Sequence, residues 1–416
     1  MNKNSILTAK QFSAVNMETG KTIWFSRTHS PQHLYPLMEK DYCEAIKYAI
    51  QHGIDQMPIL SVSSKDFPYC DFDCKDCLAC PSRKWAVADQ HIKYPIIPID
   101  KYKNILDEIS SYSSRRGFNT VRFEICGEGN PDLYKDRISM IEHANQKCNM
   151  GIVYVSTGSK ISDKLLDCLV ENASFIRISF PGISADAYKT YSNQKSKNND
   201  FSYDDAIHLL DKLCNARAKI GRENSLLIGT RTCIRPLNAG HYDDFIRNIA
   251  NIGVDVFQGV KVLIPDFESV KYEIVSLDVI EELVSLKETA YSYGLKDYQI
   301  PNDLNTIYNN RAMVEREKPS RCWSSLISPP LYGTNLLCCV LWDRITDLNY
   351  HYGVLEGRKG ELEELMHCER AKFIMKNCPK NCTECCSFKD NNFMESLWRV
   401  LKLQENLDAV KFITNY

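Results

Sequence analysis

The sequence predicts an α/β protein built on a parallel β-sheet. Short runs rich in β-branched and aromatic residues alternate with helix-like stretches between residue 55 and about residue 262. This alternation is typical of βαβ units, in which parallel strands are covered by helices. The expected strands are Met57–Val62, Thr120–Ile125, Gly151–Ser156, Phe175–Phe180, Leu226–Cys233 and Val254–Val262. The expected helices cover 99–116, 134–147, 162–172, 203–220 and 239–252. Such strands fit either a doubly wound sheet or an incomplete barrel, and the periodicity does not distinguish them.

The chain divides into four parts on these patterns. Residues 1–55 form an N-terminal extension, with a hairpin predicted around Gly20 and a helix over Leu37–Gln51. Residues 56–300 hold the α/β domain, which ends in a further helix near 276–294. A change to Cys, Pro and turn residues predicts a small metal-bound domain over 310–390. A C-terminal helix is expected in 391–416, mainly over Phe393–Leu407.

Composition excludes several classes of protein. The chain has 416 residues, 44% of them hydrophobic, which is enough to bury a large core. Its net charge of −2 argues against a general nucleic-acid binder or an anionic-membrane binder, because both need a basic surface. No stretch approaches the roughly 20 apolar residues that span a bilayer. We therefore expect a cytoplasmic protein.

Cysteine is unusually frequent, with 18 residues, and eight of them gather in two regions. In a reducing compartment such groups indicate metal ligation and not disulfides. The first group is Cys70, Cys74, Cys77 and Cys80, and the second is Cys378, Cys382, Cys385 and Cys386. The isolated cysteines in helix-like stretches are expected to be small buried residues, and they are Cys43, Cys148, Cys168 and Cys214.

The first group follows closely on the first predicted strand. Cys70, Cys74 and Cys77 have C-x3-C-x2-C spacing, so three thiolates can reach one metal centre. A cubane cluster has four irons, and three thiolates leave one iron open for another ligand. The alternative is a zinc site that uses Cys80 as a fourth ligand, although zinc loops favour C-x2-C pairs.

This spacing after the first strand resembles the signature of the radical S-adenosylmethionine (SAM) superfamily. The resemblance implies that the open iron binds the amino and carboxylate groups of SAM. Asp76 departs from the family, in which an aromatic or apolar residue precedes the third cysteine. After the second predicted strand, Cys126-Gly127-Glu128 resembles the Gly-Gly-Glu motif of the family, with Cys126 in place of the first glycine.

Later strand ends also resemble family positions that contact SAM, and they add Ser156, Ser179, Arg231 and Asn238 to the SAM-binding candidates Gly127 and Glu128. An arginine can hold the SAM carboxylate through two parallel hydrogen bonds, although a fold-stabilising role for Arg231 is equally open. The resemblance covers about residues 57–262. It implies a partial (β/α)6 radical SAM barrel followed by a small Cys-rich domain.

The C-terminal cysteines resemble a SPASM or twitch domain, which carries an auxiliary cluster. Cys322, Gly333 and Cys338 have C-x10-G-x4-C spacing, and Gly333 permits a tight hairpin. The resemblance implies a second 4Fe–4S cluster held by Cys322, Cys338, Cys382 and Cys385, with Cys378 as an alternate ligand. A structural zinc ribbon is the alternative, because four cysteines in two pairs also suit tetrahedral zinc.

The resemblance implies an oxidoreductase-type enzyme that cleaves SAM reductively. A one-electron reductase such as flavodoxin or ferredoxin would supply the electron, and the resulting 5′-deoxyadenosyl radical would remove a hydrogen atom from the substrate. A ribosomally made peptide is the favoured substrate, and a sugar or aminocyclitol metabolite that is dehydrogenated or epimerised is the alternative. Candidates to return a hydrogen atom are Cys126, Cys233 and Cys339. A non-catalytic zinc protein is the rival from another class, and an RNA-modifying enzyme is disfavoured by the net charge.

Overall fold

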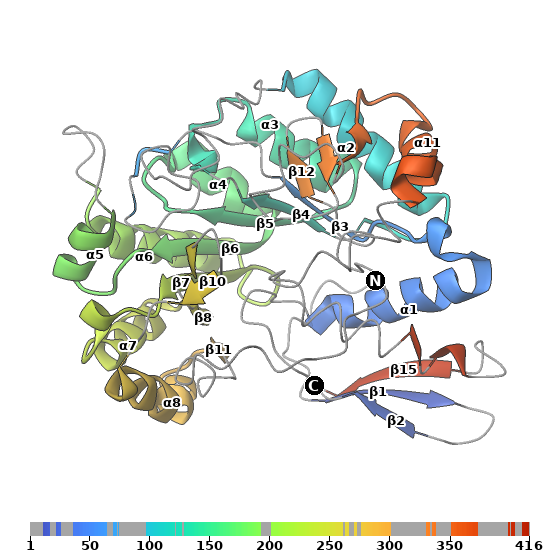
Figure 1. Cartoon of the computed structure of the whole chain (residues 1–416). Helices are drawn as coiled ribbons and strands as arrows, with labels where there is room; N and C mark the ends of the chain where they lie inside the picture. Colours follow the sequence, from blue (N-terminus) through green and yellow to red (C-terminus); the bar gives the residue numbers. More distant parts are fainter. Residues whose placement is uncertain are drawn as a thin grey trace.

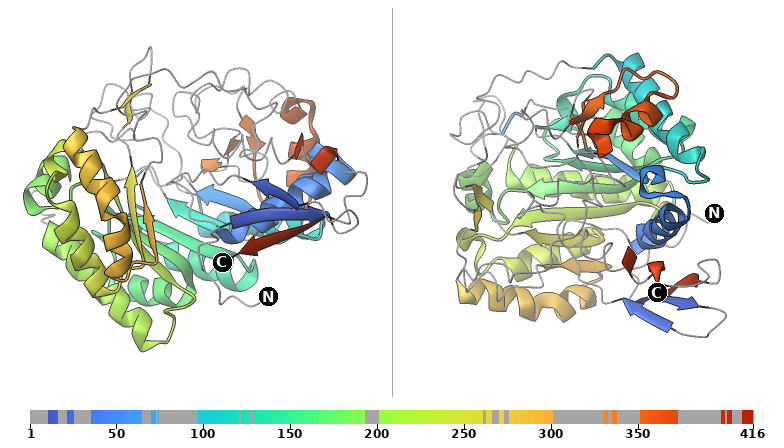
Figure 2. Two further views of the ribbon diagram at one scale, coloured as in Figure 1. Left: turned by 90° about the horizontal axis from the view of Figure 1, so that it is seen from below. Right: turned by 45° about the vertical axis from the view of Figure 1, so that its right-hand side comes forward.

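The computed structural model shows a curved sheet with helices on its convex side (Figures 1 and 2). It describes residues 11–16, 22–25, 36–64, 70–72, 74, 97–120, 122–126, 129–192, 201–260, 263–265, 270–272, 276–300, 330–332, 335–337, 351–372, 398–399, 401–403 and 410–415.

Seven parallel strands form the main part of the sheet, and they lie in chain order. They are β3 (Ser61–Ser64), β4 (Arg122–Cys126), β5 (Gly151–Ser156), β6 (Ala173–Phe180), β7 (Leu227–Cys233), β8 (Val256–Val260) and β11 (Asp297–Gln299). Connections of one hand between strands in this order place all the helices on one face, whereas a doubly wound sheet reverses its order. The order therefore decides for an open barrel, and β11 adds a seventh parallel strand to the six that the sequence predicts.

The helices lie between these strands as the periodicity predicts. They are α2 (Ile99–Ser114), α3 (Arg137–Glu142), α4 (Asp163–Asn172), α6 (Tyr203–Lys219), α7 (Tyr242–Ile252) and α8 (Leu277–Ser292). A π-helical turn over His143–Lys147 continues α3. The short helix α5 (Ala185–Ser192) lies between β6 and α6 and was not predicted. Their apolar faces and the outer face of the sheet form one continuous core.

Local sequence explains where several helices begin and end. Ser162 caps α4 through its side chain, and Ser202 and Asp205 form a capping box at the start of α6. Gly253 takes a left-handed conformation directly after α7, which suits glycine best. These signals were readable in the sequence, and the observed bounds lie close to the expected ones.

Three short strands extend the sheet beyond β3. They are β12 (Pro330–Tyr332), β13 (Asn335–Leu337) and β14 (His351–Val354). β12 pairs in parallel with β3, and β12 and β13 pair antiparallel on either side of Gly333, where the sequence predicts a hairpin. Part of the expected 310–390 domain therefore continues the main sheet.

The two ends of the chain meet in a separate sheet. β1 (Gln11–Asn16) and β2 (Thr22–Phe25) pair antiparallel, followed by α1 (Pro36–His52). β15 (Val410–Asn415) pairs with the other edge of β1. The helix that the sequence predicts runs over Phe393–Leu407, and beyond it residues 410–415 form a strand because β1 offers them a partner far away in the sequence. A further pair, β9 (Leu263–Pro265) and β10 (Val270–Tyr272), is antiparallel. None of the described helices is both long and apolar enough to cross a membrane.

Candidate active site

The loop after β3 carries the first two predicted cluster ligands. Cys70 and Cys74 are both partly exposed and pack against the main core. Between them, Phe72 is buried and anchors the loop. Cys77 and the alternative ligand Cys80 lie outside the described residues. The loop therefore offers at least two thiols at the carboxyl end of the first parallel strand.

Asp71 connects this loop to the loops after β4 and β5. Its Oδ1 accepts a hydrogen bond from Asn130 Nδ2 at 3.0 Å, and its Oδ2 accepts one from Ser159 Oγ at 2.6 Å. Asn130 Nδ2 also donates to Ser159 Oγ at 2.9 Å. Charge-assisted hydrogen bonds of this kind are the strong ones, so three consecutive strand ends are held in one arrangement.

A second carboxylate lies beneath this connection. Asp132 is buried and accepts hydrogen bonds from Ser156 Oγ at 2.6 Å and Tyr154 Oη at 2.8 Å. Burial raises the pKa of Asp132, and the hydrogen bonds from Ser156 and Tyr154 oppose the rise. Ser156 Oγ also accepts from Gly158 N at 2.8 Å. Ser156, a predicted SAM contact, therefore uses its hydroxyl to hold the loops after β4 and β5.

The predicted residue Asn238 is also engaged with the protein. Its Nδ2 donates to the Cys233 carbonyl at 2.9 Å, and its Oδ1 accepts from Ile183 N at 3.2 Å. This buried side chain connects the loops after β6 and β7. Asn238 therefore positions the strand ends, whatever ligand they bind.

The concave face of the sheet carries the other predicted residues that the structure describes. Side chains alternate along each strand, so residues that share a face are two apart. On β6 this face holds Arg177 and Ser179, and on β7 it holds Arg231 and Cys233. On the neighbouring strands β3 and β4, Ser63 Oγ lies 3.2 Å from Cys126 Sγ, in hydrogen-bond contact.

Arg231 stands among these groups. Burial and the positive charge of Arg177 lower the pKa of Arg231 to about 10, and negative charge at Cys233, Glu124 and Cys126 opposes this shift. The structure thus brings the candidate SAM ligand Arg231 near both described hydrogen-donor candidates, Cys126 and Cys233. The remaining candidates lie outside the described residues. They are Gly127, Glu128, Cys339 and the proposed auxiliary-cluster ligands Cys322, Cys338, Cys378, Cys382 and Cys385.

Tyr188 on α5 is a site residue that sequence reasoning missed. Its side chain is 1% exposed, and its hydroxyl has no hydrogen-bond partner in the described part of the chain. Burial, followed by charge at Cys74 and Asp71, raises the pKa of Tyr188, which places it beside the cysteine loop. The sequence did hold a signal for the helix that carries Tyr188. Ser184 precedes α5, and its Oγ accepts a hydrogen bond from Ala187 N at 3.3 Å, as a helix-capping serine does.

No protein-family model and no curated protein matches the chain, but solved structures share its fold. SuiB from Streptococcus suis, bound to the precursor peptide SuiA, has a TM-score of 0.55 and 13% identity over 84% of this chain and 74% of SuiB. The protein anSMEcpe with bound AdoMet has a TM-score of 0.53 and 14% identity, covering 80% of this chain and 87% of anSMEcpe. A structure of anSMEcpe with AdoMet and the Cp18Cys peptide has a TM-score of 0.52 and 15% identity over the same shares.

Both neighbours are radical SAM enzymes. The chain has the radical SAM fold. In this radical SAM fold, Cys70 and Cys74 follow the first of the consecutive parallel strands, as the sequence predicts. Thiolates are the ligands that iron–sulfur clusters require, and the buried Tyr188 hydroxyl, which feels the charge of Cys74, has no hydrogen-bond partner among the described residues. The described residues therefore fit such a cluster.

The isolated cysteines belong to the core of the radical SAM fold. Cys43, Cys148, Cys168 and Cys214 are all buried, as predicted. Burial raises the pKa of Cys148, Cys168 and Cys214 to about 12, so these thiols stay protonated at neutral pH. Buried, protonated thiols of this kind suit packing in the core.

Proposed function

We propose that the chain is a radical SAM enzyme whose SAM-binding 4Fe–4S cluster is ligated by Cys70, Cys74 and Cys77. The observation that carries the proposal is the place of Cys70 and Cys74 after the first strand of a radical SAM fold. Asp71, between them, holds this loop to the loops after β4 and β5. A structural zinc loop has no need of that connection to neighbouring strand ends.

The bound cluster and SAM together would supply a 5′-deoxyadenosyl radical, at the expense of one electron from a reductase such as flavodoxin or ferredoxin. The protein's part is to hold SAM and the substrate and to exclude water. Arg231 would bind the SAM carboxylate, Ser179 would face SAM from the neighbouring strand, and Gly127 and Glu128 would hold its amino group. Asp71, Asn130 and Asp132 keep these strand ends in register.

Cysteine thiols on the concave face are proposed to return a hydrogen atom where the substrate is not oxidised overall, and the thiyl radical left behind would take one electron from the reductase and a proton. Cys126 is nearly buried and touches Ser63, while Cys233 is partly exposed at the end of β7. The greater exposure of Cys233 makes it the more accessible donor of the two. Cys339 is the third candidate.

A second 4Fe–4S cluster is proposed on the C-terminal cysteines Cys322, Cys338, Cys382 and Cys385, with Cys378 as the alternate ligand. The support is that β13 ends directly before Cys338 and, through β12, lies next to β3. Such a cluster can accept an electron from a substrate radical, and the substrate then loses a proton, so the net reaction is an oxidation. A zinc ribbon at these cysteines is the alternative.

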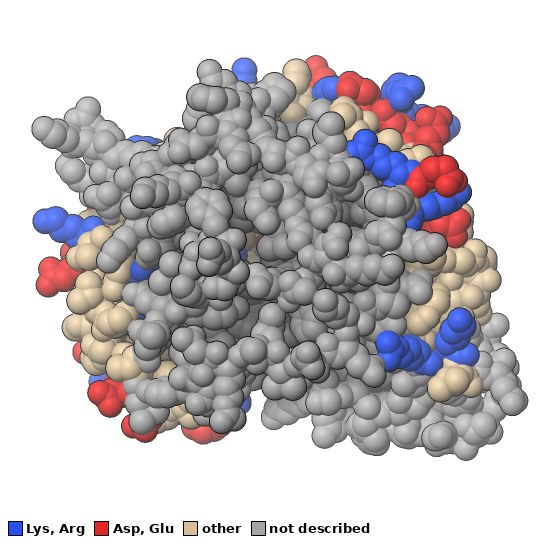
Figure 3. Space-filling model, in the orientation of Figure 1, with Lys and Arg blue, Asp and Glu red and all other residues tan. Residues whose placement is uncertain are grey.

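The proposed substrate is a ribosomally made peptide. SuiB bound to a precursor peptide and anSMEcpe bound to the Cp18Cys peptide have a similar fold, which favours a peptide over a sugar or aminocyclitol. The described charged side chains of both signs are interspersed on the face in Figure 3, without a continuous basic patch there. That surface offers no specific support for a nucleic-acid substrate. A cytoplasmic enzyme of this kind would meet both its reductase and a newly made peptide.

The test is anaerobic reconstitution of the full chain with iron and sulfide, followed by SAM and dithionite. We expect 5′-deoxyadenosine and about eight irons per chain, as two cubanes require. Cys74→Ala should abolish deoxyadenosine formation, whereas Cys214→Ala, a matched change of a buried cysteine, should leave it intact. A colourless, inactive protein that holds zinc would contradict the proposal and favour the zinc protein.

The auxiliary cluster is tested separately with the double variant Cys322→Ala and Cys338→Ala. We expect its iron content to fall to about four per chain, while SAM cleavage continues. An unchanged iron content, or zinc bound to the wild-type chain at these cysteines, would leave the SAM-cleaving cluster in place and reject the auxiliary one.

A further inference from the structure

The concave face of the barrel has an apolar end. Val153, Phe175 and Val256 form a small buried cluster that is separate from the main core. Gly229 allows this packing, because a Cβ atom there would lie only 2.8 Å from the Phe175 ring. Along β6 this cluster comes first, and the side chains that follow on the same face lie nearer to the cysteine loop.

Arg177 is the next side chain after Phe175 on that face, and it is buried without a counter-charge among the described residues. It is 6% exposed, and its Nη1 donates to Gln258 Oε1 at 3.0 Å, while its Nε has no partner. Gln258 in turn donates from Nε2 to Gln299 Oε1 at 2.9 Å. Arg177 is therefore held by neutral amides, which fix its direction but do not balance its charge.

The other charges on this face do not neutralise Arg177. Arg122 and Glu124 pair with each other at 3.5 Å. No described carboxylate forms an ion pair with Arg177 or Arg231, and their mutual repulsion contributes to the lowered pKa of Arg231. Burying a cation without an anion costs several kcal/mol, so two arginines that find no carboxylate in the described part of the chain indicate an anionic ligand.

In the proposed enzyme the SAM carboxylate binds Arg231 and leaves Arg177 without an anion. Arg177 lies two residues deeper than Ser179 on β6, about 7 Å farther from the strand end. A second anion is therefore required between the SAM level and the apolar cluster.

We infer that Arg177 binds a carboxylate of the substrate. This inference rests on the proposed function and specifies its substrate class: a peptide with an acidic side chain at or beside the reacting residue. The guanidinium group matches a carboxylate through two parallel hydrogen bonds, and the apolar cluster of Val153, Phe175 and Val256 lies beneath it on the same face.

Glutarate is a suitable probe, because it carries carboxylates on a short methylene chain. Its binding to the reconstituted full chain, saturated with SAM and without reductant, is measured by calorimetry. We expect glutarate to bind, and we expect that neutral glutaramide does not displace it. Arg177→Gln should weaken glutarate binding about tenfold or more, and Arg177→Lys should weaken it less.

Arg247→Gln is the matched control, since Arg247 lies exposed on α7. Its glutarate affinity should equal that of the wild type, and far-ultraviolet circular dichroism should show all variants folded. Absence of glutarate binding, equal binding by Arg177→Gln, or displacement of glutarate by excess SAM would overturn the inference. Deoxyadenosine formation by the same preparation reports on the proposed function independently, so the two failures are distinguishable.

Discussion

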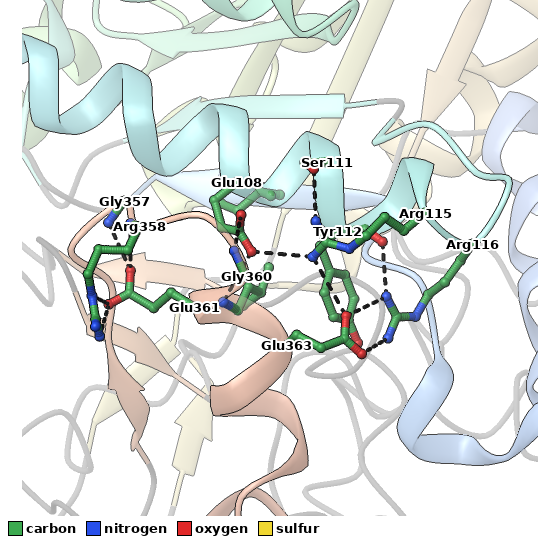
Figure 4. A network of polar contacts seen from close by, with 12 residues as sticks. Glu108, Ser111, Tyr112, Arg115, Arg116, Gly357, Arg358, Gly360, Glu361 and Glu363 are labelled. Carbon is green, nitrogen blue, oxygen red and sulfur yellow. Dashed lines mark hydrogen bonds and ion pairs between the residues drawn. The ribbon is translucent and has the colours of Figure 1, made fainter.

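Arg116 and Glu363 lie 247 residues apart and form an ion pair through two parallel hydrogen bonds (Figure 4). Arg116 Nη2 donates to Glu363 Oε1 at 2.6 Å, and Nη1 donates to Oε2 at 3.0 Å. Arg116 follows α2, and Glu363 lies on α11 (Glu361–His367). The pair therefore fixes a segment between the proposed auxiliary-cluster cysteines to the outside of the barrel.

Arg116→Ala should destabilise this attachment by about 2–4 kcal/mol. Arg116 is buried, and the change also removes its hydrogen bonds to the carbonyls of Gln56 at 3.0 Å and Tyr112 at 3.1 Å. Urea unfolding measures the cost, and hydrogen exchange in residues 351–372 shows whether this segment loosens first. The more exposed neighbour Arg115, changed to Ala, is the control and should cost less. Equal effects of the two changes would contradict the prediction.

The same ion pair predicts a dependence of stability on pH. The hydrogen bond from Arg116 lowers the pKa of Glu363 below its ordinary value of 4.5. A carboxyl group with a lowered folded-state pKa contributes its full stability above the unfolded-state value and loses it as the pH falls through the folded-state value. The difference in unfolding free energy between the wild type and Glu363→Gln should therefore be constant near neutrality and shrink below pH 4.5.

Exposed Glu369, changed to Gln, provides the control for that titration. The unfolding free energy of Glu369→Gln should follow that of the wild type across the whole pH range. The unfolding free energies of the wild type and Glu363→Gln could instead differ by a constant amount down to the acid transition. That result would show that the pair contributes no pH-dependent stability.

The parallel strands and their helices were predictable because their pattern is local. Apolar β-rich runs, helical periodicity and capping residues such as Ser202 each mark an element within its own short stretch of sequence. Strands β11 to β13 have three residues each, which is too short for a period of two to be recognised. β15 pairs with β1 across almost the whole chain, and no local signal encodes such a partner.

The site was predictable at the level of motifs but not of side-chain direction. The cysteine spacing marks Cys70 and Cys74, since the chemistry needs only thiols that lie close together. Whether Ser156 or Arg231 faces the ligand depends on which face of a strand each occupies, and a shift of one residue exchanges the faces. Arg177 lacks any motif, and only the absence of a counter-charge among the residues that the structure describes reveals it.

Asp71→Ala should weaken the SAM site without unfolding the chain. The change removes both hydrogen bonds that hold the cysteine loop to Asn130 and Ser159. We expect lower iron retention and about tenfold weaker SAM binding in the reconstituted enzyme, because charge-assisted hydrogen bonds are lost. Iron analysis and calorimetry measure the two effects. Asp167→Ala on the exposed face of α4 is the control, and equal SAM affinity in both variants would refute the positioning role of Asp71.

Gly229→Ala should distort the apolar end of the concave face. The added Cβ would lie 2.8 and 2.9 Å from two atoms of the Phe175 ring and 3.2 Å from Val256 Cβ. Because these neighbours are packed side chains, we expect a loss of about 1–3 kcal/mol in unfolding free energy. Gly259→Ala is the matched control on β8, where a new Cβ meets its nearest neighbour at 3.4 Å, an ordinary contact.

Phe175→Leu, which has a smaller side chain, tests whether a clash with the Phe175 ring causes the loss of unfolding free energy in Gly229→Ala. Combined with Gly229→Ala, it should recover part of the unfolding free energy, since the space that the ring occupied accepts the new methyl group. Gly229→Ala should also weaken glutarate binding, because Arg177 follows Phe175 on the same face of β6, and the double variant should recover part of that binding. Additive losses in the double variant would mean that the ring and the methyl group do not collide, and that Gly229 is required for another reason.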